Sequence, residues 1–555
     1  MPLGWWTAPI VRSGLVSTLE GPPLSEARGV GSLTLGGFIE EVAERFSDNE
    51  ALVFDDPLRG GATVRWTYRD VLMESRRVAS ALIANGVGPG TPVGILMGSR
   101  PEAVAAFFGA ALSGAVAVLF STFSSQAELE FLLDHSRAQI LLTQATLLGR
   151  DLVEEVEPVR PGHLRRIAAV GTPEWDGFLA GGSGEAGPTV SAGDPGTIIY
   201  SSGTTDRPKG VLHRQGAPSF QFWQQAQVFG RGEGTRMWTA LPMFWTAGLN
   251  TAMGATLAAG GCWVMQETFQ PAEALRLLER EQVTEPYTLP HQTAALAELP
   301  DWEKADLSSL KFVFGKSAFA RHPSVAGDPA WNMPVAYGLS ETCATFATHY
   351  YNTARELLKE STGRLLPGNR LRVVDPDSGR SLGPGESGEL AVRGPTLMEH
   401  YVGMTPEQCF DRDGFFHTGD AGWFDDDGYL HWTGRRSEMI KTAGANVSPA
   451  EIEVALRAFQ PVKLARVLGR PDPRVGEVVV LCVVLREGAS ATDDDVRAFL
   501  RERLAAYKVP KEILFMSDGE VPMTASDTKV RDAELRKLVD ERLQGLQRNT
   551  SQTGA

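Results

Sequence analysis

Apolar residues recur at two different spacings near the start of the chain. Between residues 68 and 83 they return every three or four positions, which predicts an amphipathic helix. The next run, "VGILM" (93–97), is short and continuously apolar, as is typical of a strand buried on both faces. A second helix is expected from Pro101, because proline is favoured in the first helical turn. This alternation predicts a layered α/β fold for the N-terminal half.

One apolar stretch, "AVAAFFGAALSGAVAVLF" (103–120), is long enough to cross a membrane. It is rich in alanine and glycine, and Ser113 and Gly114 interrupt it. We therefore expect a buried helix that leads into a buried strand, with no membrane insertion.

From about residue 387 the pattern changes to short alternating runs separated by turn residues. In "GWFDDDGYLHWTG" (422–434), Asp427 and Gly428 mark a hairpin, and we place a domain boundary at its end, Gly434. Further on, "SPAEIE" reads as a helix start, "VVVLCVVL" as a buried strand and Thr492 as a helix cap. The sequence thus predicts two domains, 1–434 and 435–555, of which the second is a small α+β unit.

Length, charge and cysteine content narrow the class of protein. The chain has 555 residues, more than one ordinary domain core holds. Its net charge of -15 argues against a nucleic-acid surface, and any anionic ligand would need local cations. The four cysteines lack metal-ligand spacing, and the first residues lack the pattern of a signal peptide. These features favour a cytoplasmic enzyme.

The stretch "SSGTTDRPKG" (201–210) follows a short apolar strand, "TIIY". Backbone N–H groups, hydroxyls and an ammonium can all donate to one anion, so this loop suits a polyphosphate. It is not a Walker A loop, because Pro208 precedes Lys209 and the extended run "GVLH" follows in place of a helix. Taken alone, such a loop is an ordinary turn about as often as a binding site.

The loop resembles the signature [ST]SGTTGxPKG of the adenylate-forming superfamily, which includes acyl-CoA synthetases, luciferase and peptide-synthetase adenylation domains. Further motifs follow in the family's order: "YGLSE" (337–341), "HTGDAGWFDDDGYLHWTGR" (417–435), "IKTAGANVSPAEIE" (440–453) and "VPMTASDTKV" (521–530). The resemblance spans nearly the whole chain and implies an acyl-CoA ligase. It implies a large N-terminal α/β domain of layered sheets with a small β-barrel-like part, and a small mobile α+β C-terminal domain.

The implied reaction has two steps. A carboxylate attacks the α-phosphate of ATP to give acyl-AMP and pyrophosphate, and the thiol of coenzyme A then takes the acyl group. Cations and donors should therefore dominate the site. The positions that match the family's ATP and AMP site are Ser201, Ser202, Gly203, Thr204, Thr205, Lys209, Gly315, Lys316, Ser317, Tyr337, Gly338, Ser340, Asp420 and Arg435.

The resemblance assigns roles within this set. The hydroxyl-rich loop with Lys209 resembles a cradle for the β,γ-phosphates. Tyr337 resembles the residue that packs on adenine, and Ser340 the hydroxyl on the α-phosphate. Glu341 resembles the Mg²⁺ ligand, for which an oxygen donor is apt. Asp420 would accept hydrogen bonds from the ribose hydroxyls, with Arg435 as a neighbouring donor.

Other positions match the family's second step and its acyl site. Lys529 resembles the lysine that enters the site for adenylation and leaves it for thioesterification, and Ser437 occupies the hinge. Lys441 and Gly444 would face coenzyme A in the second pose. The implied acyl pocket comprises Phe244, Trp245, Thr246 and Gly338.

The phosphate loop departs from the family's pattern at Asp206, which stands where glycine is usual. A carboxylate about 4 Å from a phosphate charge costs on the order of 4 kcal/mol at an effective dielectric of about 20. Asp527 and Thr528 also replace the glycine that usually precedes the catalytic lysine. Both departures affect phosphate handling, so one hypothesis is a ligase with impaired adenylation that thioesterifies a preformed acyl-adenylate.

Several alternatives stay open at this point. The acceptor could be a separate carrier protein in place of coenzyme A, and a partner enzyme could supply the adenylate. A homodimer is suggested only by analogy. A non-catalytic adenylate binder is disfavoured because Glu341, Asp420, Arg435 and Lys529 are all present. The sequence does not distinguish an aryl, fatty or polycyclic acid.

Overall fold

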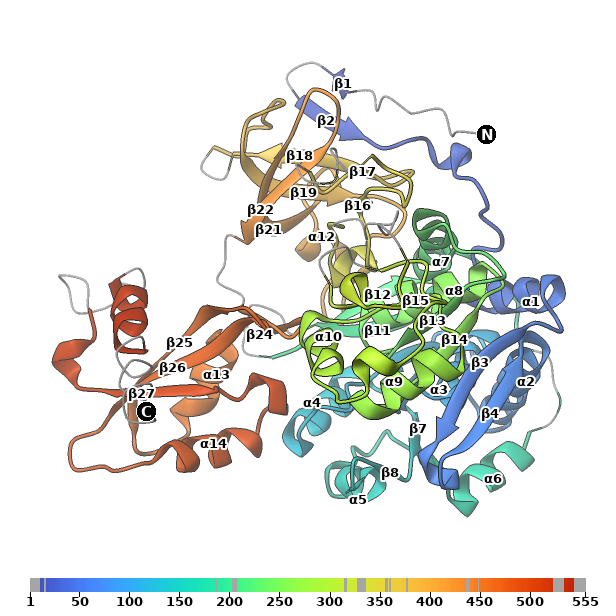
Figure 1. Ribbon diagram of the computed structural model, residues 1–555, viewed down its shortest axis with the longest axis horizontal. Helices are drawn as coiled ribbons and strands as arrows, with labels where there is room; N and C mark the ends of the chain where they lie inside the picture. The colour runs from blue at the N-terminus through green and yellow to red at the C-terminus, as the bar shows by residue number, and fades with distance from the viewer. Residues whose placement is uncertain are drawn as a thin grey trace. The chain divides into compact units, whose positions relative to one another are not determined.

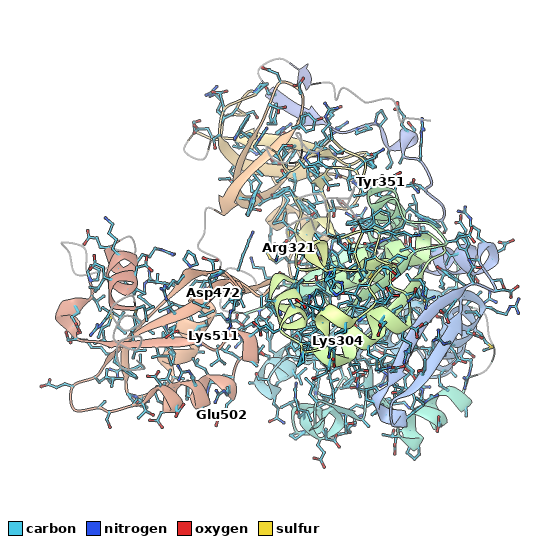
Figure 2. All side chains as sticks on the ribbon, in the orientation of Figure 1. Lys304, Arg321, Tyr351, Asp472, Glu502 and Lys511 are labelled. Carbon is cyan, nitrogen blue, oxygen red and sulfur yellow. The ribbon has the colours of Figure 1, made fainter. Side chains whose placement is uncertain are left out.

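The computed structural model describes residues 10–13, 16–182, 184, 187–201, 207–313, 317–326, 336–354, 358, 361–375, 378–435, 440–447, 449–522 and 534–543. The chain divides into two compact units (Figure 1). Unit 1 comprises Met1–Thr122, Leu129–Ser201 and Lys209–Arg436, and unit 2 comprises Phe123–Glu128, Ser202–Pro208 and Ser437–Ala555. Exposed charged side chains occur on both units, for example Lys304, Glu502 and Lys511 (Figure 2).

Unit 1 contains a seven-stranded sheet of order β10-β7-β5-β6-β11-β12-β20. Its first five strands are parallel, and β12 and β20 continue the sheet in antiparallel pairs. The strands are β5 (Pro92–Leu96), β6 (Val116–Leu119), β7 (Ile140–Gln144), β10 (Arg166–Val170), β11 (Pro195–Ser201), β12 (Lys209–Arg214) and β20 (His400–Tyr401). The predicted strands at "VGILM" and "TIIY" are thus confirmed as β5 and β11.

A second, five-stranded sheet has the order β15-β13-β14-β3-β4, with only β4 antiparallel. Its strands are β3 (Glu50–Asp56), β4 (Ala62–Thr67), β13 (Arg236–Thr239), β14 (Cys262–Met265) and β15 (Glu285–Pro286). Short pairs join β8 (Thr146–Leu147) to β9 (Arg150–Asp151), and β16 (Ala347–Thr348) to β17 (Arg364–Leu365).

Helices cover these sheets. Those of the N-terminal region are α1 (Leu35–Arg45), α2 (Tyr68–Ala84), α3 (Pro101–Leu112), α4 (Gln126–Ser136), α5 (Leu152–Val156) and α6 (Pro173–Ala180). Later come α7 (Gly216–Phe229), the π-helix η4 (Ala247–Gly254), α8 (Ala255–Ala258), α9 (Pro271–Arg280), α10 (Pro290–Ala297) and α12 (Pro406–Cys409). One core joins residues of α2 and α3 to both sheets, as Phe107 of α3, Phe54 of β3 and Ile95 of β5 illustrate.

The predicted helices begin where their sequence signals lie. Thr67 caps α2 in a reciprocal capping box with Asp70, and Pro101 opens α3. The stretch 103–120 forms most of α3 and the buried strand β6, as predicted. In the part of the chain that the structure describes, each helix is too short or too polar to cross a membrane.

The third sheet of unit 1 is antiparallel, with six strands in the order β1-β2-β18-β19-β21-β22. These are β1 (Ile10–Ser13), β2 (Val16–Glu20), β18 (Arg370–Val374), β19 (Gly388–Arg393), β21 (Phe416–Phe424) and β22 (Leu430–Arg435). The predicted hairpin is confirmed, because β21 pairs with β22 around residues 425–429. Strand β2 was not predicted, since its partner β18 is formed by distant sequence.

Unit 2 is a five-stranded sheet with helices on both faces. Its elements are β23 (Ile440–Thr442), β24 (Ala445–Val447), α13 (Pro449–Arg457), β25 (Val462–Asp472), β26 (Gly476–Leu485), α14 (Asp493–Arg501), β27 (Glu512–Met516) and a helix at 534–543. Alternate residues of β26 face different helices: Leu481 packs in the core with α13 and α14, whereas Val480 packs with the helix at 534–543. Burial on both faces explains the uninterrupted apolar run "VVVLCVVL".

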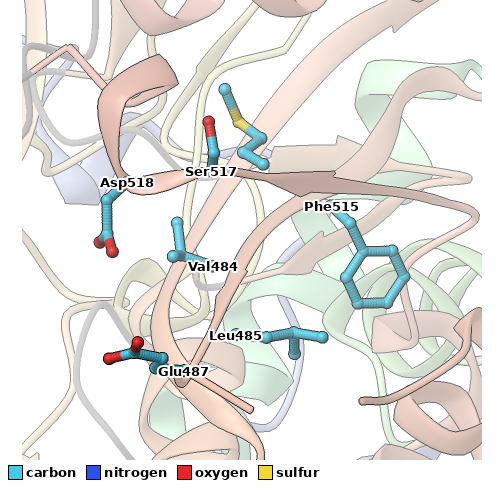
Figure 3. Close-up of a pocket in the computed structure, with 7 residues that line it drawn as sticks. Val484, Leu485, Glu487, Phe515, Ser517 and Asp518 are labelled. Carbon is cyan, nitrogen blue, oxygen red and sulfur yellow. The ribbon is translucent and has the colours of Figure 1, made fainter. Parts of the chain in front are cut away.

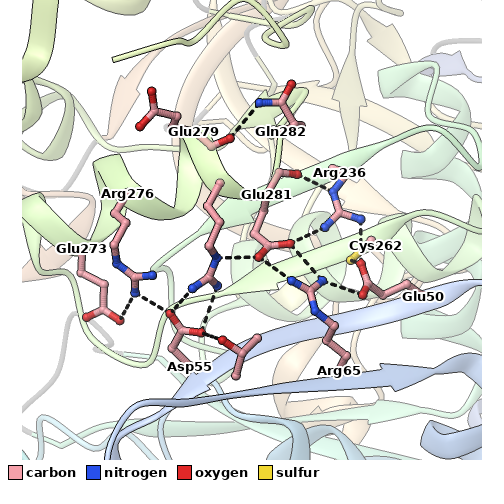
Figure 4. Close-up of polar contacts among 12 residues, drawn as sticks. Glu50, Asp55, Arg65, Arg236, Cys262, Glu273, Arg276, Glu279, Glu281 and Gln282 are labelled. Carbon is pink, nitrogen blue, oxygen red and sulfur yellow. Dashed lines mark hydrogen bonds and ion pairs between the residues drawn. The ribbon is translucent and has the colours of Figure 1, made fainter. Parts of the chain in front are cut away.

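A network of ion pairs ties the second sheet of unit 1 to α9 (Figure 4). Its centre is Glu281, whose side chain is only 3% exposed and accepts hydrogen bonds from Arg65, Arg236 and Arg280. Arg280 also donates to Asp55 of β3. Since each guanidinium contacts a carboxylate, the network compensates the charges that folding removes from water.

Candidate active site

The hydroxyl-rich loop is held between two paired strands. Ser201 ends β11 and Lys209 begins β12, and the two residues lie opposite each other in the antiparallel register. The Ser201 hydroxyl is buried and has no hydrogen-bond partner among the described residues. This buried donor without a partner lies directly before the loop. It fits a ligand that accepts hydrogen bonds, as phosphate oxygens do.

Lys209 and Glu341 both contact a third residue, Tyr401. The Lys209 ammonium lies 4.8 Å from the centre of the Tyr401 ring. The Tyr401 hydroxyl donates a hydrogen bond of 2.7 Å to Glu341 Oε1. Tyr401 belongs to β20, which pairs with β12, so the exit strand of the loop and the predicted Mg²⁺ ligand are joined through one side chain.

Ser340 and Glu341 lie in a 3-10 turn, Ser340–Thr342, that two buried side chains hold by its carbonyl groups. His213 at the end of β12 donates from Nε2 to the Ser340 carbonyl at 2.7 Å. Gln221 of α7 donates to the Thr342 carbonyl at 3.2 Å. Burial lowers the pKa of His213 to about 4, although its hydrogen bond to Ser340 opposes this shift. The imidazole is therefore neutral near pH 7.

The backbone around this turn is tightly constrained. Cys343 and Ala344 both adopt positive φ, 57° and 113°, which is uncommon for residues with a side chain. A Cβ at Gly338 would lie 1.7 Å from the Ala344 carbonyl oxygen. Position 338 therefore requires glycine because the chain turns back onto it.

The predicted adenine and ribose residues come together in the third sheet and the segment beside it. Tyr337 and Asp420 are both buried, and the tyrosine hydroxyl donates to Asp420 Oδ2 at 3.1 Å. Arg435 is the cross-strand neighbour of Asp420 in the β21–β22 pair. The structure thus brings together three residues from two separate motifs, "YGLSE" and "HTGDAGWFDDDGYLHWTGR".

The predicted acyl segment leads into the π-helix η4, which contacts the residue that follows the same turn. The Phe244 and Trp245 rings are perpendicular, with centroids 6.0 Å apart, and Thr246 leads into η4. Asn250 of η4 accepts a 3.9 Å contact from the Cys343 thiol. Two large aromatic rings so placed can form the wall of an apolar site.

Two of the predicted residues in unit 2 are described by the structure. Lys441 is exposed on β23, and its backbone N–H donates to Glu477 at 2.7 Å. Ala443 and Gly444 form a two-residue turn between β23 and β24, both with positive φ (49° and 81°). This geometry suits a type I′ hairpin, for which glycine is favoured.

Other predicted residues lie outside the described part of the chain. They are Ser202, Gly203, Thr204, Thr205, Asp206, Gly315, Lys316, Ser437, Asp527, Thr528 and Lys529. Ser317 is described and is half-buried just before the 3-10 turn Phe319–Arg321. Their assigned roles, and the role of Ser317, stay predictions.

The donor set fits Mg²⁺ held jointly by protein and substrate. Among the described residues, no three His, Cys, Asp or Glu side chains are grouped so that they could hold a metal ion. Mg²⁺ in nucleotide sites commonly takes one or two carboxylates, with substrate phosphates and water supplying the rest. Glu341, at the same turn as Ser340, offers one such carboxylate.

A cavity in unit 2 is unrelated to this constellation. It has a volume of about 470 Å³ and lies beside β26 and β27 (Figure 3). Glu487 and Asp518 place carboxylates on its rim. None of the predicted site residues that the structure describes lines it.

Sequence reasoning missed two residues of the site, Tyr401 and His213. Tyr401 lies in "EHYVG", which was not among the recognised motifs. His213 was quoted within "GVLH" only as part of an extended run. A signal for both was their position. His213 lies next to the end of the strand that leaves the loop, and Tyr401 pairs with that strand.

Comparisons with known proteins identify the family of the chain. Residues 39–402 match the family described as AMP-binding enzyme, and residues 451–528 match the AMP-binding enzyme C-terminal domain. The chain is 33% identical over 500 residues to an indoleacetate–CoA ligase of Aromatoleum aromaticum, covering 86% of this chain and 95% of that protein. It is 32% identical over 487 residues to a feruloyl-CoA synthase of an Amycolatopsis species, with the same coverage.

A solved structure is similar over the same extent. It is a double mutant of the o-succinylbenzoate CoA synthetase of Bacillus subtilis bound to a product analogue. The TM-score is 0.71 at 27% identity, covering 89% of this chain and 97% of that one. The predicted fold, a large N-terminal α/β domain followed by a small α+β domain, is thereby confirmed.

Proposed function

From the premise that this chain belongs to the family of AMP-binding enzymes and is an AMP-forming acid–thiol ligase, we propose that it joins a bulky aromatic or hydrophobic carboxylic acid to coenzyme A. The observation that carries the proposal is the cluster of Lys209, Tyr401 and Glu341 at the exit of the hydroxyl-rich loop. It offers a cation for phosphate and a carboxylate for Mg²⁺ within one connected group of side chains.

In the proposed first step, the acid's carboxylate attacks the α-phosphorus of ATP and pyrophosphate leaves. Ser201 and Lys209, with the loop between them, would hold the β,γ-phosphates, and Ser340 would donate to the α-phosphate. Glu341 would hold Mg²⁺, which neutralises phosphate charge when bound. Lys529 would add a further cation. Such catalysis depends mainly on positioning and charge neutralisation.

The nucleoside would be held at the third sheet. Tyr337 would pack on adenine, and Asp420 would accept from the ribose hydroxyls with Arg435 as a donor. Asp420 already accepts one hydrogen bond from Tyr337, and a carboxylate has capacity for several more.

In the proposed second step, the thiolate of coenzyme A attacks the acyl carbonyl and AMP leaves. Lys441 and Gly444 would serve this step, after unit 2 pivots at Ser437. Coenzyme A is preferred to a carrier protein as acceptor, because both relatives named above are CoA ligases or synthases.

Two observations support an aromatic acid. Phe244 and Trp245 present perpendicular rings, and Asn250 of the π-helix that follows them contacts Cys343, next to the turn that bears Ser340. The two relatives act, by their names, on indoleacetate and on a feruloyl group. We further propose a cytoplasmic location, which the four free cysteines support.

A split assay tests the proposal. Acid-dependent exchange between ATP and pyrophosphate is measured beside CoA thioester formation, for a panel of aryl and fatty acids that includes indoleacetate and ferulate. We expect both activities, with aryl acids preferred. Absence of thioester with every acid would contradict the proposal.

Asp206→Gly is the matched variant for the first step. If the carboxylate opposes binding of the polyphosphate, this change raises the rate of exchange between ATP and pyrophosphate. The rate of thioester formation from chemically prepared acyl-AMP should not rise with it. Thioester formation from acyl-AMP without any exchange would instead identify an enzyme that has lost adenylation.

A further inference from the structure

The contacts of Tyr401 divide between its ring and its hydroxyl. The ring faces the Lys209 ammonium at 4.8 Å, and the hydroxyl donates to Glu341 Oε1 at 2.7 Å. The tyrosine is 8% exposed, so its own position is fixed by packing. A cation and a carboxylate are thus both bound to one aromatic side chain.

The backbone beside Tyr401 makes the same two connections. The Met398 N–H donates to the Glu341 carbonyl at 2.7 Å, and the Val402 N–H donates to the Gly210 carbonyl at 2.8 Å. The Glu399 N–H donates to the Leu212 carbonyl at 2.7 Å. Residues 398–402 therefore form a strap between the exit strand β12 and the turn that bears Glu341.

The two opposite charges that contact Tyr401 do not pair with each other. Among the described residues, no carboxylate oxygen lies within 4.0 Å of the Lys209 ammonium, although Glu341 contacts the same tyrosine. In a direct ion pair, the cation would not be available for phosphate and the carboxylate would not be available for Mg²⁺. A neutral phenol instead orients the carboxylate by a hydrogen bond and leaves its charge in place.

We propose that Tyr401 is a positioning residue of the nucleotide site, which holds Glu341 in the orientation for Mg²⁺ and Lys209 in the orientation for phosphate while it prevents them from pairing. The inference rests on the proposed function, because it takes Mg²⁺ and ATP as the ligands. It adds a residue that lies outside the motifs by which the chain was recognised.

Calorimetric titration of ATP, with and without Mg²⁺ and in the absence of any acid, tests the role without relying on turnover. Tyr401→Phe removes the hydroxyl and keeps the ring. We expect the tightening of ATP binding by Mg²⁺ to fall about tenfold, the effect of one hydrogen bond to a charged group. Binding of ATP without metal should change less than about twofold, since the ring still faces Lys209.

Tyr401→Leu removes the ring as well. If the ring prevents the pairing, Lys209 pairs with Glu341 in this variant, so we expect metal-free ATP binding to weaken several-fold, in addition to the loss seen with phenylalanine. The control is Tyr429→Phe. Tyr429 also has a cation over its ring, Arg364 at 4.4 Å, but none of its described contacts reaches Glu341. This variant should bind ATP and Mg²⁺ as the unchanged protein does.

Two results would overturn the proposal. One is a Tyr401→Phe protein whose Mg²⁺-dependent tightening equals that of the unchanged protein. The other is an equal weakening with and without metal together with a lowered melting temperature, which is a general structural effect. Failure of the proposed function gives a different pattern, in which the unchanged protein binds Mg²⁺ and ATP but forms no thioester with any acid.

Discussion

At the scale of single residues, the turn that bears Ser340 is held by a histidine outside the predicted set of site residues. His213 is fully buried, with Nε2 bound to the Ser340 carbonyl and Nδ1 without a hydrogen-bond partner among the described residues. Protonation would place an imidazolium in an apolar setting with only one acceptor, which explains the lowered pKa of His213.

This histidine predicts a pH dependence of stability. Its pKa is about 4 when folded against an ordinary value of 6.5, so the unfolded chain binds the proton more tightly. The contribution of His213 to the free energy of unfolding is fully present above pH 6.5 and is lost as the pH drops towards 4. Between about pH 7.5 and about pH 5.5 the loss is roughly 1 kcal/mol.

The measurement is urea unfolding of the unchanged protein and of His213→Gln at both pH values. Glutamine can still donate to the Ser340 carbonyl but does not titrate, so this variant should lose less stability between the two pH values. Equal losses in the two proteins would contradict the assignment.

Trp245 carries a second prediction at this scale. Replacing it with alanine removes the larger of the two rings of the predicted acyl segment. We expect kcat/KM for an aryl acid to fall about 10- to 100-fold, the effect of about 1–3 kcal/mol of lost contact. The KM for ATP should be unchanged, and a parallel rise in that value would argue against an acyl-pocket role.

Residue roles were only partly predictable from the sequence. Tyr337, Asp420 and Glu341 could be named because each sits in a recognisable motif. Tyr401 could not be named, because its importance depends on β20 pairing with β12, a contact between segments nearly two hundred positions apart. Periodicity carries no information about such a pairing.

At the scale of elements, the turn that bears Ser340 depends on close backbone approach. Gly338→Ala would place a methyl group 1.7 Å from the Ala344 carbonyl oxygen, so the segment must shift. We expect ATP binding to weaken at least about tenfold. The reason is that a shift of about 1 Å in the segment that bears Ser340 would misplace groups that have to be positioned for the nucleotide.

Gly177→Ala is the matched control for this prediction. Gly177 lies in α6, and a Cβ there meets nothing within 4 Å. Alanine should stabilise the helix by about 0.5–1 kcal/mol without changing ATP binding. Thermal unfolding and titration of both variants provide the test, and normal ATP binding by Gly338→Ala would contradict the argument.

Elements with strong local signals were predicted well. Helix α2 shows its capping residue and its apolar spacing in the sequence, and α14 begins after Thr492 as expected. Strand β2 has no such signal, since its pairing with β18 is set by tertiary structure. The π-helix η4 was also not predicted, because its apolar residues resemble those of any buried segment.

At the scale of the whole molecule, buried charge has to be balanced across elements. Burial alone would raise the pKa of Glu281, but hydrogen bonds from Arg65 and Arg280 outweigh that effect and leave it below its ordinary value. Glu281→Gln leaves three guanidinium groups without this carboxylate. Because Arg65 and Arg236 still pair with Glu50, Arg280 still pairs with Asp55, and all three guanidinium groups are partly exposed, we expect a loss of about 1–3 kcal/mol in the free energy of unfolding.

The comparison for this variant is Asp48→Asn, which removes an exposed pair. Asp48 and Arg69 are 84% and 68% exposed, so their contact should add little. Urea unfolding should show a large shift for Glu281→Gln and no measurable one for Asp48→Asn. Equal shifts would mean that the network adds no more than a surface pair.

Strand β26 has neighbouring strands along both edges and helices on both faces. An amide proton at its centre therefore reaches solvent only when the surrounding unit comes apart. Its exchange with deuterium should be the slowest in unit 2, and its rate would report the opening free energy of the unit as a whole. The amide exchange rate of this strand, which its apolar run makes recognisable in the sequence, thus measures how often unit 2 unfolds under native conditions.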